Sequence, residues 1–172
     1  MLISEEQRDI LGEIVNIGIG RAAAALNDMV GHHIQLQIPH IEVFDEHALQ
    51  DHWLQTRKGK TSSVYMDFNG TFAGNAALMF PPESAAILIA TLTDEPPHEG
   101  EMDALCVGTL TEVGNILING VIGSISNALN ANMRFSLPSY IECEAHDLIN
   151  HTQLKSATIL IANTTFSIDE LQ

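Results

Sequence analysis

The sequence predicts an α+β fold, in which an antiparallel β-sheet carries two long helices, related by a pseudo-twofold axis, on one face. The first observation behind this fold class is a repeated pair of residues: Glu13 and Asn16 recur 99 positions later as Glu112 and Asn115. The second is that each pair lies in a long segment with helical periodicity, followed by strand-like segments in a similar order. The 172 residues therefore suit a single domain, with half-repeats at about 1–98 and 99–172.

A polar stripe follows the first of these predicted helices. Asp9, Glu13, Asn16 and Gly20 are separated by four, three and four residues, so a helix places them on one face. Two carboxylates, a carboxamide and a residue without a side chain thus share one surface. In each copy the asparagine is followed 23 positions later by a proline; these prolines are Pro39 and Pro138.

The first half is expected to begin with a helix from about Ser4 to Val30. Ser4 and Gln7 form a capping-box signature, and Gly31 supplies a C-terminal stop. Three glycines inside the helix each cost roughly 1 kcal/mol relative to alanine. They indicate either close packing of a neighbouring element, which we favour, or room for a docking partner. These glycines are Gly12, Gly18 and Gly20.

Strands and turns are expected to complete this half. Asn69-Gly70 is the strongest two-residue turn signal and predicts a hairpin. The other expected elements are strands over Ile34–Ile38 and Ile41–Phe44, a short helix and loop over Asp45–Lys60, hairpin strands over Thr61–Phe68 and Thr71–Phe80, a helix over Glu83–Leu92 and a linker over Asp94–Gly100.

The second half is expected to repeat this order in a shorter form. Its apolar run over Val113–Leu129 is broken by asparagines and serines, which favours a buried core helix over a membrane span. The expected elements are a helix over Glu101–Ala131, a strand over Met133–Leu137, an extended segment over Tyr140–Ala145, a polar loop over His146–Leu154 and strands over Ser156–Ala162 and Thr164–Ile168.

The charge balance excludes several classes of partner. The formal net charge is −15, with only seven Lys plus Arg. Such a chain cannot neutralise a nucleic-acid backbone, and an anionic membrane surface would repel it. The N-terminus has no basic region followed by an apolar one, so no secretory signal is expected and the expected compartment is the cytoplasm.

The cysteines and histidines do not predict a metal site. Cys106 and Cys143 form neither a disulfide framework nor a metal knuckle, and Cys106 is expected to be a small buried apolar residue. His47, Asp51 and His52 lie close in sequence but lack the ligand spacing of known zinc sites. A solvated polar segment is the preferred interpretation there.

A neighbouring glutamate and asparagine on a helix surface can position reactants. A carboxamide can both donate to and accept from one water molecule, holding it in line for attack, and a carboxylate beside it can pair with a lysine of a partner. Phosphoryl transfer depends mostly on such placement and on electrostatics. For a single isolated pair of this kind, ordinary exposed helix surface is the preferred interpretation. The double occurrence at matching helix positions, each with its downstream proline, weakens that alternative.

The pattern resembles the CheC/CheX/FliY family of bacterial chemotaxis phosphatases. The family's signature is an Asp or Ser, a Glu four residues later, an Asn three residues after that, and a Pro some twenty-odd residues further on. Most of the chain takes part, from about Ser4 to Ile168. The first copy matches with Asp9, Glu13, Asn16 and Pro39, and the second with Glu112, Asn115 and Pro138.

This resemblance implies a CheC-like fold and hydrolysis of the aspartyl-phosphate on a CheY-type response regulator. Asn16 and Asn115 would each enter the partner's active site and orient the attacking water. Glu13 and Glu112 would pair with the partner's phosphate-contacting lysine. The resemblance also implies that Mg²⁺ belongs to the response regulator, so the chain would need no cofactor or metal of its own.

The second copy departs from the family pattern. Gly108 stands at the position that corresponds to Asp9, and Asn119 stands at the position that corresponds to Gly20. Asp9, Gly20 and Asn119 are therefore candidate supporting residues. The departures also keep a second hypothesis open: a non-catalytic module of the same fold that docks a CheD-type receptor deamidase or a flagellar motor component. A homodimer is compatible with both hypotheses.

Overall fold

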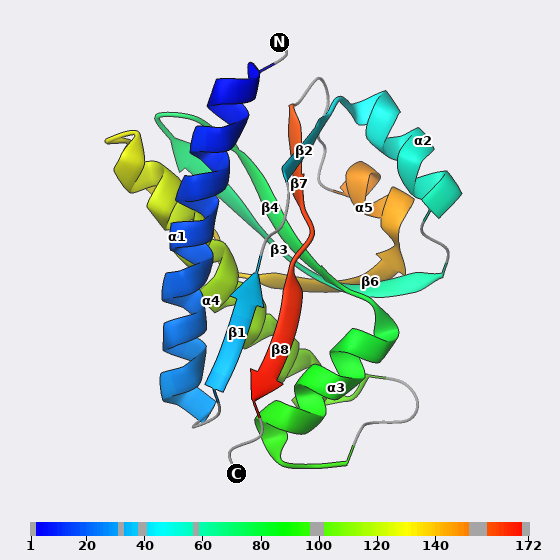
Figure 1. Ribbon diagram of the computed structural model, residues 1–172. Helices are drawn as coiled ribbons and strands as arrows, with labels where there is room; N and C mark the ends of the chain where they lie inside the picture. Colours follow the sequence, from blue (N-terminus) through cyan, green and yellow to red (C-terminus); the bar gives the residue numbers. More distant parts are fainter. Residues whose placement is uncertain are drawn as a thin grey trace.

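The computed structural model describes residues 3–30, 33–37, 41–56, 59–96, 102–151 and 158–169. Within them, the order helix, two strands, helix, two strands occurs twice, with one additional helix between the two runs (Figure 1). This repeated order supports the predicted duplication, although the half-repeat boundaries stay a prediction. The helices are α1 (Glu5–Val30), α2 (Glu46–Thr56), α3 (Pro82–Thr93), α4 (Ala104–Ala128) and α5 (Ala145–His151).

All strand pairings among the described residues are antiparallel, which confirms the α+β class. β3 pairs with β4 and also with both β5 and β6, whereas β1–β8 and β2–β7 form separate two-stranded ladders. In the duplicated order β2 corresponds to β6 and β7 to β3, so the pairings β2–β7 and β3–β6 are equivalent. The strands are β1 (His33–Gln37), β2 (Ile41–Phe44), β3 (Lys60–Gly70), β4 (Gly74–Phe80), β5 (Met133–Phe135), β6 (Ser139–Glu144), β7 (Ile159–Ala162) and β8 (Thr165–Asp169).

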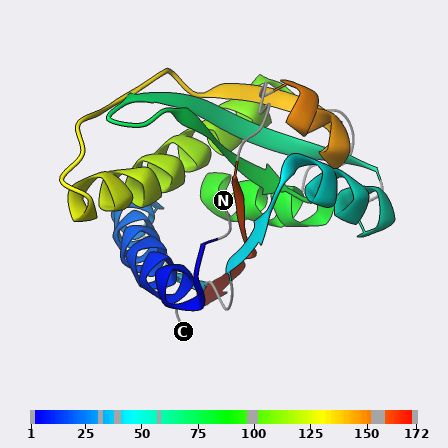
Figure 2. The same ribbon diagram turned by 90° about the horizontal axis from the view of Figure 1, so that it is seen from above.

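The two long helices lie side by side, and each also contacts a different group of strands. α4 packs against β3 and β4, and α1 packs against β1. In Figure 2 the layer of β3, β4 and β6 lies over α4, with α1 next to α4. The helix pair therefore joins the four-stranded sheet to the β1–β8 ladder.

The main core lies between α4, α1 and the β3–β4 layer. Leu26, Val64, Leu110 and Val113 are fully buried there. Length and composition alone would let α4 cross a membrane, but its buried residues pack against these neighbouring elements, as expected of a core helix. A second, smaller cluster joins α2 to α5 and β7; it contains Leu49, Trp53, Ala145 and Ile159.

Two glycines lie where the backbones of α1 and α4 come into close contact. A Cβ atom placed on Gly18 would lie 2.6 Å from the Cα of Val121 and 2.7 Å from the carbonyl oxygen of Gly120. A Cβ atom on Gly120 would lie 2.9 Å from the carbonyl oxygen of Gly18. Close packing therefore explains Gly18, while a Cβ atom on Gly20 would meet nothing within 4 Å.

The N-termini of both long helices are capped by side chains. The predicted capping box is confirmed: the backbone N–H of Gln7 donates to Ser4 Oγ (3.2 Å), and the backbone N–H of Ser4 donates to Gln7 Oε1 (2.9 Å). In α4 the Asp103 carboxylate accepts from the backbone N–H of Cys106 (2.8 Å). This cap explains why α4 begins at Ala104, three residues later than predicted.

The predicted hairpin is confirmed, since β3 and β4 pair antiparallel from Ser62–Phe80 to Phe68–Gly74, but the two-residue turn at Asn69-Gly70 is too short. β3 continues through both residues, which pair with Arg134 and Met133 of β5, and the connection to β4 follows at residues 71–73. Gly70 has φ +146°, and a Cβ atom there would overlap the carbonyl oxygen of Asn132. The glycine is thus needed for a close approach to the segment before β5, a contact between residues distant in sequence.

The predicted polar loop over His146–Leu154 is also wrong in its first part. Ala145–His151 forms α5, because Ala145 and Leu148 are buried and contribute an apolar side that packs toward α2. Residues 152–154 lie outside the described residues, as do Gly31, the predicted helix stop, and Pro39, the first of the two motif prolines.

The α1–α4 crossing gives a stability prediction. Gly18→Ala is expected to lower the free energy of unfolding by about 1–3 kcal/mol, because the added methyl group overlaps the α4 backbone. Gly20→Ala is the matched control, since it is expected to raise stability by up to about 1 kcal/mol through helix propensity in open space. Urea unfolding of the two variants measures both. Equal stability of the two variants would contradict the close crossing.

Candidate functional site

The first stripe lies on the exposed face of α1. Asp9, Glu13, Asn16 and Gly20 are all exposed, as predicted. They are held there because the opposite face of the helix is apolar and packs into the core. The residues on that inner face are Val15, Ile19, Ala22, Ala23 and Leu26.

The functional groups of the first stripe are free to meet a partner. Within the described part of the chain, neither the Asn16 carboxamide nor the Glu13 carboxylate makes a hydrogen bond or an ion pair. Gly20, one turn after Asn16, adds no side chain that could cover it, and the space beside it is open. A carboxamide with no internal partner keeps both its donor and its acceptor capacity for a ligand.

The second stripe lies on α4 and differs in its local contacts. Glu112 is exposed, but Asn115 and Asn119 are half-buried. Asn119 Nδ2 donates to the backbone carbonyl oxygen of Asn115 (2.9 Å) and to Asn115 Oδ1 (2.7 Å). The structure thus brings the predicted residues Glu112, Asn115 and Asn119 together on α4. The carboxamide oxygen of Asn115 accepts a hydrogen bond from within its own helix.

A shallow hollow adjoins Glu112. Its volume is about 350 Å³. Gly108 forms part of its wall, and a Cβ atom on this glycine would meet nothing within 4 Å. The first stripe has the Asp9 side chain at the corresponding position, so the two copies differ in shape as well as in charge. The other lining residues are Met29, Leu92, Ala104, Leu105 and Thr109.

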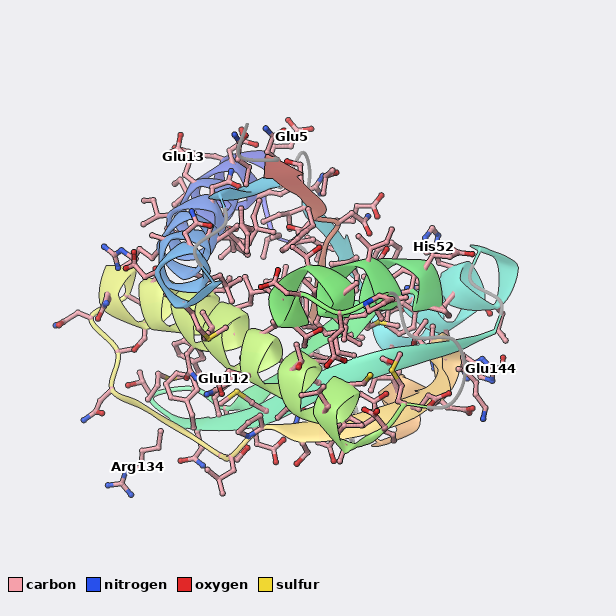
Figure 3. All side chains as sticks on the ribbon, turned by 90° about the horizontal axis from the view of Figure 1, so that it is seen from below. Glu5, Glu13, His52, Glu112, Arg134 and Glu144 are labelled. Carbon is pink, nitrogen blue, oxygen red and sulfur yellow. The ribbon has the colours of Figure 1, made fainter. Side chains whose placement is uncertain are left out.

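The two stripes lie on two helices that pack against each other, but they occupy separate places on the molecule. Figure 3 shows Glu13 on α1 and Glu112 on α4. Between the helices, Arg21 Nη1 donates to Ser124 Oγ at 3.5 Å, which adds a polar contact near the glycine crossing. Sequence reasoning did not single out Arg21, or the hollow beside Glu112, since both depend on which elements become neighbours.

The cysteines do not supply a nucleophile. Both are free and buried. Burial, together with the Asp103 side chain, raises the pKa of the Cys106 thiol, and burial, together with the charge of Asp147, raises the pKa of the Cys143 thiol. A raised pKa leaves the reactive thiolate scarcer at neutral pH than in a free cysteine.

Metal ligands do not gather in the described part of the chain: no three His, Cys, Asp or Glu side chains there lie close enough to share an ion. The candidate site is formed by the carboxylate–carboxamide pairs, of which the pair on α1 is exposed and the pair on α4 has a half-buried Asn115. Such a pair can position water and a cation of a partner, but it has no nucleophile of its own.

A family model described as chemotaxis phosphatase CheX matches residues 62–162, which is more than half of the chain. The chain belongs to this family. The match includes Glu112 and Asn115 of the second stripe, whereas the first stripe lies before it. Membership confirms the resemblance drawn from the repeated Glu and Asn, but it does not test the roles of the individual residues.

Similarity to individual proteins extends over more of the chain. The CheY-P phosphatase CheC of Bacillus subtilis is 26% identical over 139 residues, which are 79% of this chain and 66% of that protein. The crystal structure of Thermotoga maritima FliY has a TM-score of 0.79 at 19% identity and covers 100% of this chain and 88% of that one. The crystal structure of the Borrelia burgdorferi CheX–CheY–BeF3–Mg complex has a TM-score of 0.53 at 19% identity. The match covers 91% of this chain and 98% of that one.

The difference in exposure between the stripes predicts a difference in chemical labelling. Asn16→Cys is expected to react rapidly with a thiol reagent in the native protein, because position 16 is exposed, and Asn115→Cys more slowly, because position 115 is half-buried. The buried native Cys106 and Cys143 should react only after unfolding. Mass spectrometry of labelling time courses at pH 8 measures all four rates. Rapid labelling of the native cysteines before unfolding would contradict their burial.

Proposed function

We propose that this protein hydrolyses the aspartyl-phosphate of a CheY-type response regulator in chemotaxis signalling. The observation that carries the proposal is the exposed pair on α1, in which Asn16 and Glu13 have no hydrogen-bond partner in the described part of the chain. Family membership, the relative named as a CheY-P phosphatase and the fold shared with the CheX of a CheX–CheY complex support it.

The proposed reaction needs a positioned water molecule. The Asn16 carboxamide enters the receiver's active site and holds a water in line with the phosphorus. The water oxygen forms a bond to phosphorus while the bond from phosphorus to the receiver's aspartate oxygen breaks. The aspartate leaves as a carboxylate, and the water's protons pass to solvent and to the released phosphate.

The carboxylates serve recognition. Glu13 pairs with the receiver's phosphate-contacting lysine and thereby aligns Asn16 with the phosphoryl group. Glu112 and Asn115 have the same roles in the second stripe. Asp9, on the same face of α1, contributes to the surface that meets the receiver.

The metal requirement lies with the partner in this proposal. Mg²⁺ bound by the receiver neutralises charge on the phosphoryl group, and the residues of this chain contribute none of its ligands. Receivers of this type act inside the cell, so the proposed site of action is the cytoplasm.

The second candidate function is a non-catalytic docking module. The half-buried Asn115 and the missing acid at Gly108 favour it for the second stripe. Its occupant would be a CheD-type deamidase or a flagellar motor component. The free Asn16 on α1 favours catalysis for the molecule as a whole.

Loss of the carboxamides is expected to abolish most of the activity. The chain is mixed with a phosphorylated CheY-type receiver and Mg²⁺, and the decay of the aspartyl-phosphate is followed. Asn16→Ala combined with Asn115→Ala should lower the rate by about 10²- to 10³-fold, as removal of a preorganised donor does in other enzymes. Asn127→Ala, which removes an exposed carboxamide at the far end of α4, is the control and should retain the wild-type rate.

Two outcomes would redirect the assignment. A wild-type protein that does not outpace the spontaneous decay of the aspartyl-phosphate would favour the docking module. If the double variant is as fast as the wild type, the protein is still a phosphatase, but Asn16 and Asn115 do not have the proposed roles.

A Glu13→Gln variant separates recognition from chemistry. It keeps the shape of the side chain but removes the charge that pairs with the receiver's lysine. We expect KM for the phosphorylated receiver to rise about 3- to 10-fold in an Asn115→Ala background, the effect of one charge-assisted contact. Steady-state kinetics at two salt concentrations measure the change, which should shrink at high salt. An unchanged KM would exclude Glu13 from partner recognition.

A further inference from the structure

We propose that Asn119 is a positioning residue that restrains Asn115, so that the two stripes are unequal and the second acts only after this restraint is released. The inference rests on the proposed function, since it concerns the state of one of its two sites. It adds a regulatory residue that lies on the chain itself, one helical turn beyond the carboxamide that it controls.

The hydrogen bonds identify the atoms without ambiguity. The backbone carbonyl oxygen of Asn115 is an obligatory acceptor, so the Asn119 atom 2.9 Å from it must be the donor Nδ2. The same Nδ2 lies 2.7 Å from a second side-chain atom, and an NH₂ group in that position requires this atom to be the acceptor Oδ1 of Asn115. One amide group therefore holds both oxygens of Asn115.

This geometry directs the Asn115 carboxamide along its own helix. A side chain that enters another protein's active site must extend away from the helix surface, with its oxygen available to the attacking water. The Asn115 oxygen is instead bonded to a residue four positions later on α4, and the side chain is half-buried. For Asn115 to enter a receiver's active site, its hydrogen bond to Asn119 must break, or both side chains must turn outward together.

The first stripe supplies the unrestrained comparison. Gly20 occupies the position that corresponds to Asn119, so no side chain reaches back to Asn16, which is exposed. A Cβ atom added at Gly20 would meet nothing within 4 Å. The two copies therefore differ at this position by one hydrogen-bond donor. Substitutions at positions 20 and 119 can add this donor to the first stripe or remove it from the second.

Releasing the restraint is expected to activate the second stripe. In an Asn16→Ala background, where only the second stripe remains, Asn119→Ala should raise kcat by about 3- to 10-fold, the effect of one net hydrogen bond, with KM for the phosphorylated receiver unchanged. Asn119→Gln, which restores a donor, should return kcat toward the starting value. An unchanged or lower kcat for Asn119→Ala would show that Asn119 does not restrain Asn115, and would overturn the proposal.

The reciprocal exchange tests the same idea at the first stripe. In an Asn115→Ala background, Gly20→Asn should lower kcat by about 3- to 10-fold, because the new carboxamide can bond to Asn16. Gly20→Ala is the matched comparison, since it adds a side chain without a donor and should retain more activity than Gly20→Asn. Equal rates for these two variants would overturn the proposal.

A measurement that does not depend on catalysis distinguishes failure of the proposed restraint from failure of the proposed function. In nuclear magnetic resonance spectra, the side-chain NH₂ protons of Asn119 should be shifted downfield and exchange more slowly than those of Asn16. Asn115→Ala, which removes the Oδ1 acceptor but keeps the backbone carbonyl oxygen, should reduce this difference. Absence of this signature overturns the restraint. Its presence, with no phosphatase activity in any variant, overturns the proposed function instead, and with it the regulatory role of the bond.

Discussion

The close crossing of α1 and α4 is the constraint on which the rest of the structure depends. Gly18 and Gly120 bring the two helix backbones together at a distance that no side chain at either position allows. Asn16 precedes Gly18 by two residues and Asn115 precedes Gly120 by five, so the crossing also determines how the two carboxamides are placed. A shift at the crossing would move both stripes, because each is part of one continuous helix.

The strands add a second constraint, since their pairings join the two halves of the chain. β2 pairs with β7, and β3 pairs with β5 and β6, so each half satisfies backbone hydrogen bonds of the other. Neither half could keep these bonds alone. Both stripes are therefore presented by one interlocked unit, and a change in one half reaches the other through the shared strands and the helix pair.

Local rules explain what the sequence predicts correctly. The capping box at Ser4 and the exposure of Asn16 follow from helix geometry within a few residues. The hairpin between β3 and β4 is confirmed, but the two-residue turn at Asn69-Gly70 is wrong in length because Gly70 pairs with Met133, a partner no local rule reveals. At the site, the four-residue spacing of the two asparagines on α4 is a local signal for their bond, whereas the hollow beside Glu112 depends on elements that meet only in the folded chain.

The two copies also show how a repeated motif can yield sites of different character. The glutamate and asparagine are the same in both, and the helices that carry them are of nearly equal length. The copies differ one turn before the glutamate, where the first has Asp9 and the second has Gly108. They also differ one turn after the asparagine, where the first has Gly20 and the second has Asn119. Of these neighbours, Asn119 engages the carboxamide oxygen of Asn115 within its own helix, whereas Gly20 leaves the Asn16 carboxamide uncovered. The surroundings of the two carboxamides therefore depend on residues beyond the glutamate–asparagine pair.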